Sequence, residues 1–309
     1  MGTRKLRRGA LVSAVVAGAL GVTALAYADL TQTPVKNNPF VGETVGYQND
    51  TYLAFTRNST AHPKDFALYL QARAGGPVTR VNPEKSRGFP GSIDGSTLIY
   101  QQVTNGQSDI KMYDIGTQAR SNPPAGFNTT EWELSPTMTP DWIFFLRSGH
   151  NADKAILYDR NGGTFQQIDS VNWNRSGTAY MFAARVNGNY AVWTRCTSAK
   201  VCRVKVRNLL TSTTTTIPTP TGKLDYASSV GTDGTVYLIR SGSACGAGVR
   251  LRAISPTGDD TLLVQFSSGV DVTETDVHST GTSDEVLYGK YRCSAGSSHA
   301  DLYQVTNPI

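Results

Sequence analysis

Four cysteines are the residues of this chain with the clearest chemistry: Cys196, Cys202, Cys245 and Cys293. An even number of cysteines in an exported protein indicates disulfides, whereas a zinc site favours closely spaced Cys-x2-Cys pairs, which this sequence lacks. Cys196 and Cys202 lie at the two ends of one expected hairpin. Cys245 and Cys293 lie in equivalent loops of neighbouring repeats. The sequence therefore predicts two disulfides, Cys196–Cys202 and Cys245–Cys293.

Acidic residues form the second group that could do chemistry. They fall near the start of the expected inner strands of a repeated unit, with Arg87 and Tyr180 near equivalent points: Glu131, Glu133, Asp225, Asp271, Glu274 and Asp276. Converging carboxylates can hold a cation such as calcium, or serve as acid and base in glycoside cleavage. They can equally be solvated loop ends. The inner strands are expected to line a central channel, and the sequence does not decide whether its mouth holds a ligand or ion site. It predicts no other cofactor.

The four histidines do not form a recognisable metal motif. His62, His150 and His299 are expected in loops on one face, and His278 on an inner strand. The repeats that carry the three loop histidines are not all adjacent, so we interpret these residues as solvated. The sequence also lacks nucleophile, zinc-protease, phosphate-binding and dinucleotide motifs. It therefore points to no catalytic residue.

The elements that must position these residues repeat along the chain. Short runs rich in Ile, Phe, Tyr and Trp are bounded by Gly, Asn and Asp, which is typical of β-strands joined by hairpins. Matching strands begin near Thr51, Ser96, Asp141, Tyr190, Thr235 and Glu285, at spacings of 45 to 50 residues. A period of about 40 to 50 residues with four strands per unit is the signature of a propeller blade. The sequence predicts an all-β fold, a six-bladed β-propeller of four-stranded antiparallel blades.

The expected blades form a single domain over residues 29–309. They cover residues 41–83, 86–124, 129–170, 176–218, 223–266 and 270–309. The last blade has no room for an outer strand, whereas residues 31–38 have no place in the first blade and resemble its outer strand. We predict that residues 31–38 complete blade six and close the ring, because closure removes exposed sheet edges.

Residues 1–28 have the features of a secretory signal peptide. Basic residues precede a run of small and apolar residues from Ala10 to Ala26, and Ala26-Tyr27-Ala28 matches an A-x-A cleavage site. An uncleaved anchor is the alternative, since a run of about 17 residues is near the lower limit for spanning a membrane. We expect cleavage after Ala28 and a bacterial protein that is secreted or held in the cell envelope, outside the membrane. The export route, general or twin-arginine, stays open.

Cleavage changes the charge balance. The whole chain has 29 basic and 24 acidic residues, a net charge of +5, and the signal peptide holds four of the basic residues and no acidic ones. The mature chain is therefore nearly neutral and has no basic cluster of the kind that binds nucleic acid. We expect a monomer whose partner is a protein or a glycan.

The repeats resemble those of TolB-like propellers, also called WD40-like or PD40 repeats. In that family a Ser-Pro-Asp-Gly turn precedes one strand, and a strand with an Asp-Ile/Leu-Tyr pattern follows. The matching segments here are SPTMTPD at 135–141, SIDGS at 92–96, DIKMYD at 109–114 and ADLYQ at 300–304. The resemblance extends over all six units, although none has the complete turn motif. It implies a scaffold used mostly for binding.

Two functions are compatible with these features. The first is a secreted, non-catalytic binding protein that uses loops on one propeller face, stiffened by the cysteines placed there. The second is a secreted carbohydrate-active lyase or hydrolase that acts at the channel mouth through carboxylates such as Glu131, Asp225 and Asp276. The absence of catalytic motifs favours the binding protein.

Overall fold

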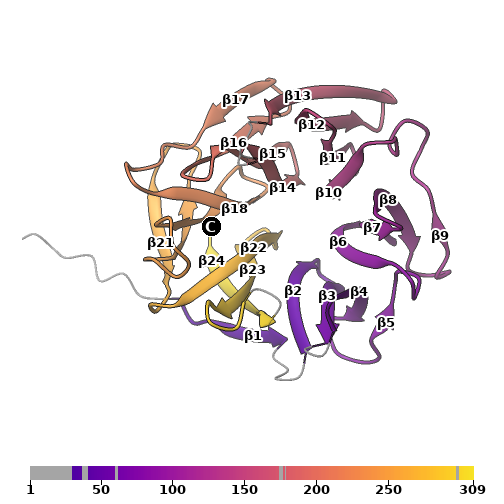
Figure 1. The fold of residues 1–309 in the computed structure, drawn as a ribbon, viewed down its shortest axis with the longest axis horizontal. Helices are drawn as coiled ribbons and strands as arrows, with labels where there is room; N and C mark the ends of the chain where they lie inside the picture. The colour runs from indigo at the N-terminus through magenta and orange to yellow at the C-terminus, as the bar shows by residue number, and fades with distance from the viewer. Residues whose placement is uncertain (1–29, 37–40, 60–61, 174–176, 178, 297–298) are drawn as a thin grey trace, which may run out of the picture.

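The described chain forms six four-stranded antiparallel sheets arranged around a central axis (Figure 1). This computed structural model describes residues 30–36, 41–59, 62–173, 177, 179–296 and 299–309. The predicted six-bladed β-propeller is confirmed. The expected signal peptide, residues 1–28, lies outside the described residues. Within the described ranges, no helix has the length and hydropathy needed to cross a membrane.

Each blade runs outward from an inner strand at the axis, and the strands of the first five blades follow one another in sequence. Blade one contains β2 (Val41–Gln48), β3 (Tyr52–Ser59), β4 (His62–Ala72) and β5 (Thr79–Arg80). Blade two contains β6 (Arg87–Asp94), β7 (Thr97–Thr104), β8 (Gln107–Asp114) and β9 (Arg120–Ser121). Blade three contains β10 (Trp132–Met138), β11 (Trp142–Ser148), β12 (Ala152–Asp159) and β13 (Thr164–Asn172).

The second half of the ring is built in the same way. Blade four contains β14 (Tyr180–Asn187), β15 (Tyr190–Ser198), β16 (Val201–Asn208) and β17 (Thr213–Thr216). Blade five contains β18 (Leu224–Val230), β19 (Val236–Ser241), β20 (Arg250–Ile254) and β21 (Asp260–Gln265). Blade six contains β22 (Val270–Ser279), β23 (Ser283–Arg292) and β24 (Asp301–Pro308).

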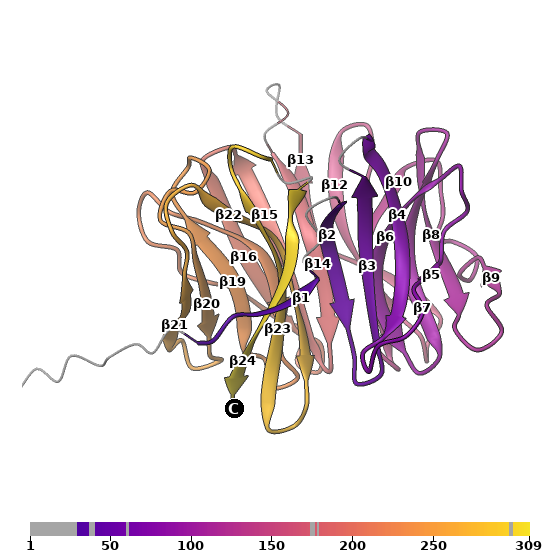
Figure 2. The same ribbon diagram turned by 90° about the horizontal axis from the view of Figure 1, so that it is seen from below.

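The N-terminal strand β1 (Thr33–Lys36) is the outer strand of blade six, as the sequence predicted. It pairs antiparallel with β24, so that the first and last strands described lie side by side in one sheet (Figure 2). Val35 packs against a buried cluster that includes Phe55 of blade one and Leu302 of blade six. The ring is therefore closed both by strand pairing and by apolar packing across the junction.

The hydrophobic core lies between successive blades. The cluster between blades three and four shows how it is built: Trp193 on β15 is fully buried, and its ring meets Phe144 on β11 edge to face, 5.8 Å between centroids. Its indole Nε1 donates a hydrogen bond of 2.9 Å to the carboxylate of Asp169. A buried tryptophan needs such a partner for its one polar group.

Every inner strand has a bulge where it pairs with the second strand of its blade. In blades three, four and five a non-glycine residue of this segment has positive φ: Ser135 (49°), Ala183 (53°) and Ala227 (51°). In blade two the segment holds Gly91, where a Cβ atom would lie 2.0 Å from the carbonyl oxygen of Pro136 in the next blade. Bulges bend and twist a strand. The bulges here let the inner strands pass close to one another near the axis.

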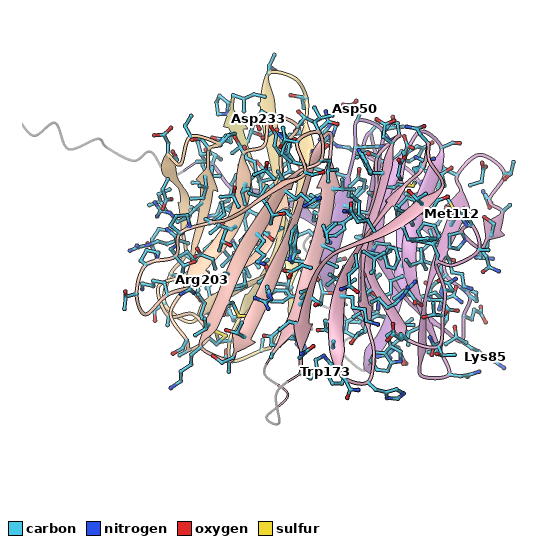
Figure 3. All side chains as sticks on the ribbon, turned by 90° about the horizontal axis from the view of Figure 1, so that it is seen from above. Asp50, Lys85, Met112, Trp173, Arg203 and Asp233 are labelled. Carbon is cyan, nitrogen blue, oxygen red and sulfur yellow. A yellow bond between two sulfur atoms is a disulfide. The ribbon has the colours of Figure 1, made fainter. Side chains whose placement is uncertain are left out.

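The two ends of the ring carry different loops. We call one end the loop face: it carries the hairpins between second and third strands and the connections into the inner strands. The opposite face carries the hairpins between first and second strands. Figure 3 shows Lys85 and Trp173 on the loop face and Asp50 and Asp233 on the opposite face.

Both predicted disulfides are present, and both lie in loop-face segments. Cys196 and Cys202 are bonded across the hairpin that joins β15 to β16. Cys245, after β19, is bonded to Cys293, after β23, and this bond joins blade five to blade six. No free cysteine remains. The loops of three blades are thus covalently fixed.

We predict that closure by β1 contributes strongly to stability. A chain that begins at Val41 lacks β1, which leaves the edge of β24 unpaired and exposes the apolar surface under Val35. Its melting temperature should fall by at least roughly 5 °C in a calorimetric scan, compared with a control chain that begins at Leu30. Equal melting temperatures would refute this role of the N-terminal strand.

Candidate functional site

Two of the acidic residues singled out in the sequence are buried partners of arginine. Glu133 on β10 accepts a hydrogen bond of 3.1 Å from Arg147, and Asp225 on β18 accepts bonds of 2.7 and 2.8 Å from Arg240. Each arginine lies directly opposite its acid, on the second strand of the same blade. The arginines also donate to backbone carbonyls of the connection from the preceding blade. These carboxylates therefore anchor the start of their blades.

Blade one contains an ion pair of the same kind, which the sequence did not reveal. Glu43 on β2 is buried and lies 3.3 Å from Arg57, opposite it on β3. Burial raises the pKa of Glu43 and of Glu133, although the arginines oppose the shift. In blades two, four and six the equivalent inner-strand positions hold Gly88, Met181 and Val272. The ion pair thus occurs in alternate blades.

Two further predicted carboxylates bind one arginine across the axis. Arg185, on β14 of blade four, is buried and donates a hydrogen bond of 2.7 Å to Glu274 on β22 of blade six. Its Nε lies 3.6 Å from the carboxylate of Asp276. Burial raises the pKa of Asp276 to about 7, and the positive charge of Arg185 limits the rise. Because β18 lies between β14 and β22 in the ring (Figure 1), the ion pair joins inner strands of two blades that are not neighbours.

Asp271 lies beside the disulfide that joins blades five and six. Its carboxylate accepts a hydrogen bond of 2.7 Å from the hydroxyl of Tyr226 and one of 3.3 Å from the backbone of Gly246. Among the described residues, Cys245, Asp271 and Cys293 are the one group with metal-ligand spacing. Both sulfur atoms belong to the disulfide, so the thiolates that would bind a metal are not available.

The remaining predicted residues lie on the loop face, in different blades. Glu131 precedes β10 and binds Lys154 through both carboxylate oxygens, at 2.9 and 3.0 Å. Arg87, the first residue of β6, is exposed. The predicted carboxylates therefore do not form one site: Glu274 and Asp276 share Arg185, and the others bind separate partners.

The histidines also lie apart. His150 is exposed in the hairpin between β11 and β12, and His299 is exposed before β24. His278, on the inner strand β22 as predicted, lies 2.8 Å from Asp50 on the opposite face. The side chain of His62 lies outside the described residues.

A pocket on the loop face, between blades three and four, combines three exposed aromatic rings. Its volume is about 590 Å³, and its wall includes Trp132, Trp173 and Tyr180. These side chains are 51%, 45% and 39% exposed, among the most exposed large hydrophobic residues of the described chain. The volume falls within the range of ligand-binding pockets. We call this feature the aromatic pocket.

The strand ends position these three rings. Trp132 begins β10, Trp173 directly follows β13, and Tyr180 begins β14. The ring of Tyr180 packs against Phe182 with 5.6 Å between centroids. The three rings belong to the two connections that enter blades three and four, so the junction between these blades presents them together.

Asp153 holds one wall of the aromatic pocket in place. Its carboxylate accepts hydrogen bonds from the indole of Trp173 (2.9 Å), the hydroxyl of Ser148 (2.7 Å) and the backbone of Met181 (2.8 Å). Glu131, which also lines the pocket, is paired with Lys154. Both pocket carboxylates are already bound within the chain, whereas the ring faces are open. This arrangement suits binding more than proton transfer.

The sequence pointed to Glu131 and Tyr180 at this junction but not to the two tryptophans or to Asp153. Trp132 lies between two acidic residues, and Trp173 follows the last strand of blade three. At both positions the repeat predicts only a strand boundary. A large aromatic residue at a predicted connection, outside the alternating pattern of the strand, was the available signal. A tryptophan that no strand face requires in the core is a candidate for exposure and binding.

Comparison with known proteins relates the fold, and not the sequence, to other propellers. No protein-family model matches this sequence, and no curated protein sequence matches it. TolB from Acinetobacter baumannii is similar in structure with a TM-score of 0.54 and 13% identity; the alignment covers 88% of this chain and 66% of TolB. The chain therefore spans about two thirds of that protein.

Two further structures align over nearly their whole length. The β-propeller domain of the Trilobed protease from Pyrococcus furiosus has a TM-score of 0.53 and 9% identity, covering 88% of this chain and 96% of that domain. An oligogalacturonate lyase in complex with manganese has a TM-score of 0.51 and 12% identity, covering 92% and 94%. The predicted TolB-like six-bladed fold is confirmed, and at these identities the likeness concerns the fold alone.

The buried carboxyl of Asp276 leads to a prediction about pH. Its pKa is about 7 in the folded chain and about 3.9 in an unfolded one, so between these values the folded state keeps a proton that the unfolded state releases. Its stabilising effect is complete below pH about 4 and is lost as pH rises to about 7. Relative to Asp276→Asn, wild type should lose on the order of 2–4 kcal/mol of unfolding free energy over this range.

Urea denaturation at pH 4, 5.5 and 7 measures this difference. Asparagine keeps an oxygen that can accept the backbone N–H of Gln48, which now donates to Asp276. Asp65→Asn, at an exposed position, is the control and should follow the wild-type curve. Parallel curves for wild type and Asp276→Asn would contradict the prediction.

Proposed function

We propose that this protein is a non-catalytic binding protein that takes a protein or glycan partner on its loop face. The observation that carries the proposal is the aromatic pocket, with the exposed rings of Trp132, Trp173 and Tyr180. Tryptophan and tyrosine dominate the energetic centres of binding interfaces, because they bury a large area and lose little conformational freedom. Exposed apolar surface of this kind usually marks an interaction site.

The rigidity of the loop face supports binding. The indole of Trp173 is fixed by its hydrogen bond to buried Asp153. The two disulfides fix neighbouring loops of blades four, five and six. A surface that is already ordered loses less entropy when a partner binds. The loop face therefore has the properties of a preorganised binding surface.

A carbohydrate-active lyase or hydrolase is the second candidate. The structural similarity to an oligogalacturonate lyase favours it. The carboxylates that we considered for this role support it less well, because Asp225 binds Arg240, Asp276 lies beside Arg185, and Glu131 binds Lys154. General acid–base catalysis needs a carboxyl within reach of a substrate proton. These ion pairs favour a binding role.

The proposal includes export to an oxidising compartment. Two disulfides among the described residues are typical of secreted and cell-envelope proteins. The expected signal peptide gives the same location. We predict that material recovered from the cell envelope or medium begins at Asp29, as N-terminal sequencing or intact-mass measurement would reveal. A chain recovered in the membrane with residues 1–28 attached would contradict this.

We predict that the double variant Trp132→Ala/Trp173→Ala binds its partner at least tenfold more weakly, a loss of about 1.4 kcal/mol or more. Binding of the mature protein to a glycan array and to purified envelope proteins identifies the partner, and titration calorimetry measures the change. Leu210→Ala, at an exposed position outside the aromatic pocket, is the matched control. Unchanged affinity in the double variant would overturn the proposal.

The same preparation tests the enzyme alternative. We expect no turnover of polysaccharide or ester substrates above background. Turnover that disappears in a folded Glu131→Gln, Asp225→Asn or Asp276→Asn variant would replace the binding role by the enzymatic one.

A further inference from the structure

A second pocket on the loop face, between blades one and two, has more basic than acidic side chains in its wall. Its volume is about 710 Å³. Four basic residues and two acidic ones, Asp65 and Glu84, form part of its wall; the basic residues are Arg57, Arg80, Lys85 and Arg87. We call this feature the basic pocket.

Two of these cations are available for a ligand. Arg57 is paired with Glu43, and Arg80 donates to backbone carbonyls nearby. The side chains of Lys85 and Arg87 are exposed and make no hydrogen bond or ion pair with any part of the chain that the structure describes. Unpaired cations at the rim of a concave site attract anions. The pocket therefore offers two positive charges to a carboxylate from solution.

Aromatic rings accompany the cations. Phe66 and Tyr69 line the basic pocket, and Phe66 packs against Phe89 with 5.4 Å between centroids. A ligand in this pocket meets both a charged group and an apolar ring. The face of a sugar ring is apolar and its edge polar, so a uronic acid, a sugar that carries a carboxylate, matches this combination.

The basic and aromatic pockets lie on the two sides of one hairpin turn. Asn105 and Gly106, between β7 and β8, line the basic pocket. The next residue, Gln107, donates a hydrogen bond of 2.7 Å to the backbone carbonyl of Glu131, which lines the aromatic pocket. The two pockets are therefore neighbours on the loop face.

A third pocket, between blades five and six, repeats the pattern. Its volume is about 570 Å³, and Tyr291, Tyr303, Lys290 and Arg292 are among its lining residues. The Nζ of Lys290 lies 3.5 Å from the centroid of the Tyr303 ring. Three pockets of similar volume, two of which combine rings with cations, thus lie at the junctions of blades one and two, three and four, and five and six.

We propose that the partner bound on the loop face is an acidic polysaccharide built from uronic acids. Lys85 and Arg87 hold carboxylates of the polymer, and the rings of Trp132 and Trp173 pack against its sugars. The repetition of ring-and-charge pockets favours a polymer with a repeating unit over a peptide, whose side chains vary along its length. This inference rests on the proposed function, because it names the class of partner for the same face.

The test compares two charged polymers with an uncharged one. Polygalacturonate and alginate are the acidic probes, and methyl-esterified polygalacturonate has the same backbone without its charges. Calorimetric titration of the mature protein at low salt should give at least tenfold tighter binding of an acidic probe than of the ester. Raising the salt concentration should weaken the binding of the acidic probe, because screening reduces the attraction of exposed charges. No binding of either acidic probe would overturn the inference.

The variant Lys85→Gln/Arg87→Gln isolates the contribution of the basic pocket. It should bind the acidic probe at least tenfold more weakly and bind the ester as wild type does. Lys111→Gln/Arg207→Gln removes two charges from the third strands β8 and β16 and serves as the control, with wild-type affinity expected. Unchanged affinity in the basic-pocket variant, or equally tight binding of polyglutamate, would overturn the inference.

Two further outcomes separate this inference from the proposed function. If Trp132→Ala/Trp173→Ala abolishes binding of an identified protein partner while Lys85→Gln/Arg87→Gln leaves it intact, the binding function stands and the acidic polysaccharide is wrong. If neither double variant changes the binding of any partner, both proposals fail.

Discussion

The structure depends on satisfying the backbone groups of six inner strands that pack edge to edge around one axis. No further strand pairs with the axial edge of an inner strand in the described sheets, so its backbone groups need side chains, loop backbone or water as partners. Ser92 and Thr137 each accept a backbone N–H from the inner strand of the next blade, at 2.5 and 2.9 Å, and Asp276 does the same for Gln48 of blade one. When the acceptor is a carboxylate, as in Asp276, a charged group is buried near the axis. Asp276 is buried, its pKa rises, and Arg185, at the equivalent position of blade four, reaches over to neutralise it.

The inner-strand carboxylates, which are the acidic residues that an enzyme would need, already have partners within the chain. The carboxylates near the axis act in closing the ring or in anchoring the blades, and their partners come from the same chain. A buried ion pair gains little net stability, but removing one partner leaves a costly unpaired charge, so these residues are tied to the fold. Chemistry open to an outside molecule is therefore found on the loop face. The exposed groups there include the rings of Trp132 and Trp173 and the cations Lys85 and Arg87.

The sequence predicted the fold more completely than the site, for a physical reason. Strand alternation and turn residues repeat with the blade, so the count of blades, the closing strand and the cysteine pairs all followed from position along the period. The site depends instead on which side chains meet between blades. Glu133 was placed correctly near the start of an inner strand, but its burial against Arg147 depends on the register of two strands and on the preceding connection. The exposure of Trp132 and Trp173 likewise depends on the pocket between blades three and four. The alternation of residues along a single strand gives no information about such a pocket.

The junctions that carry pockets alternate around the ring, as the inner-strand ion pairs do. In blades three and five the arginine of the pair donates to carbonyls of the incoming connection, so it ties the connection from the preceding blade onto the inner strand. In blade one Glu43 carries the same pair, and its backbone N–H donates to the carbonyl of Ala300 in blade six. These contacts tie the incoming connection to the inner strand at junctions two–three and four–five, and blade six to blade one. At blades two, four and six the equivalent position holds Gly88, Met181 or Val272, none of which can hold a connection by a charge. Those junctions are the ones that carry the three pockets. The ion pairs of blades one, three and five thus alternate around the ring with the three loop-face pockets.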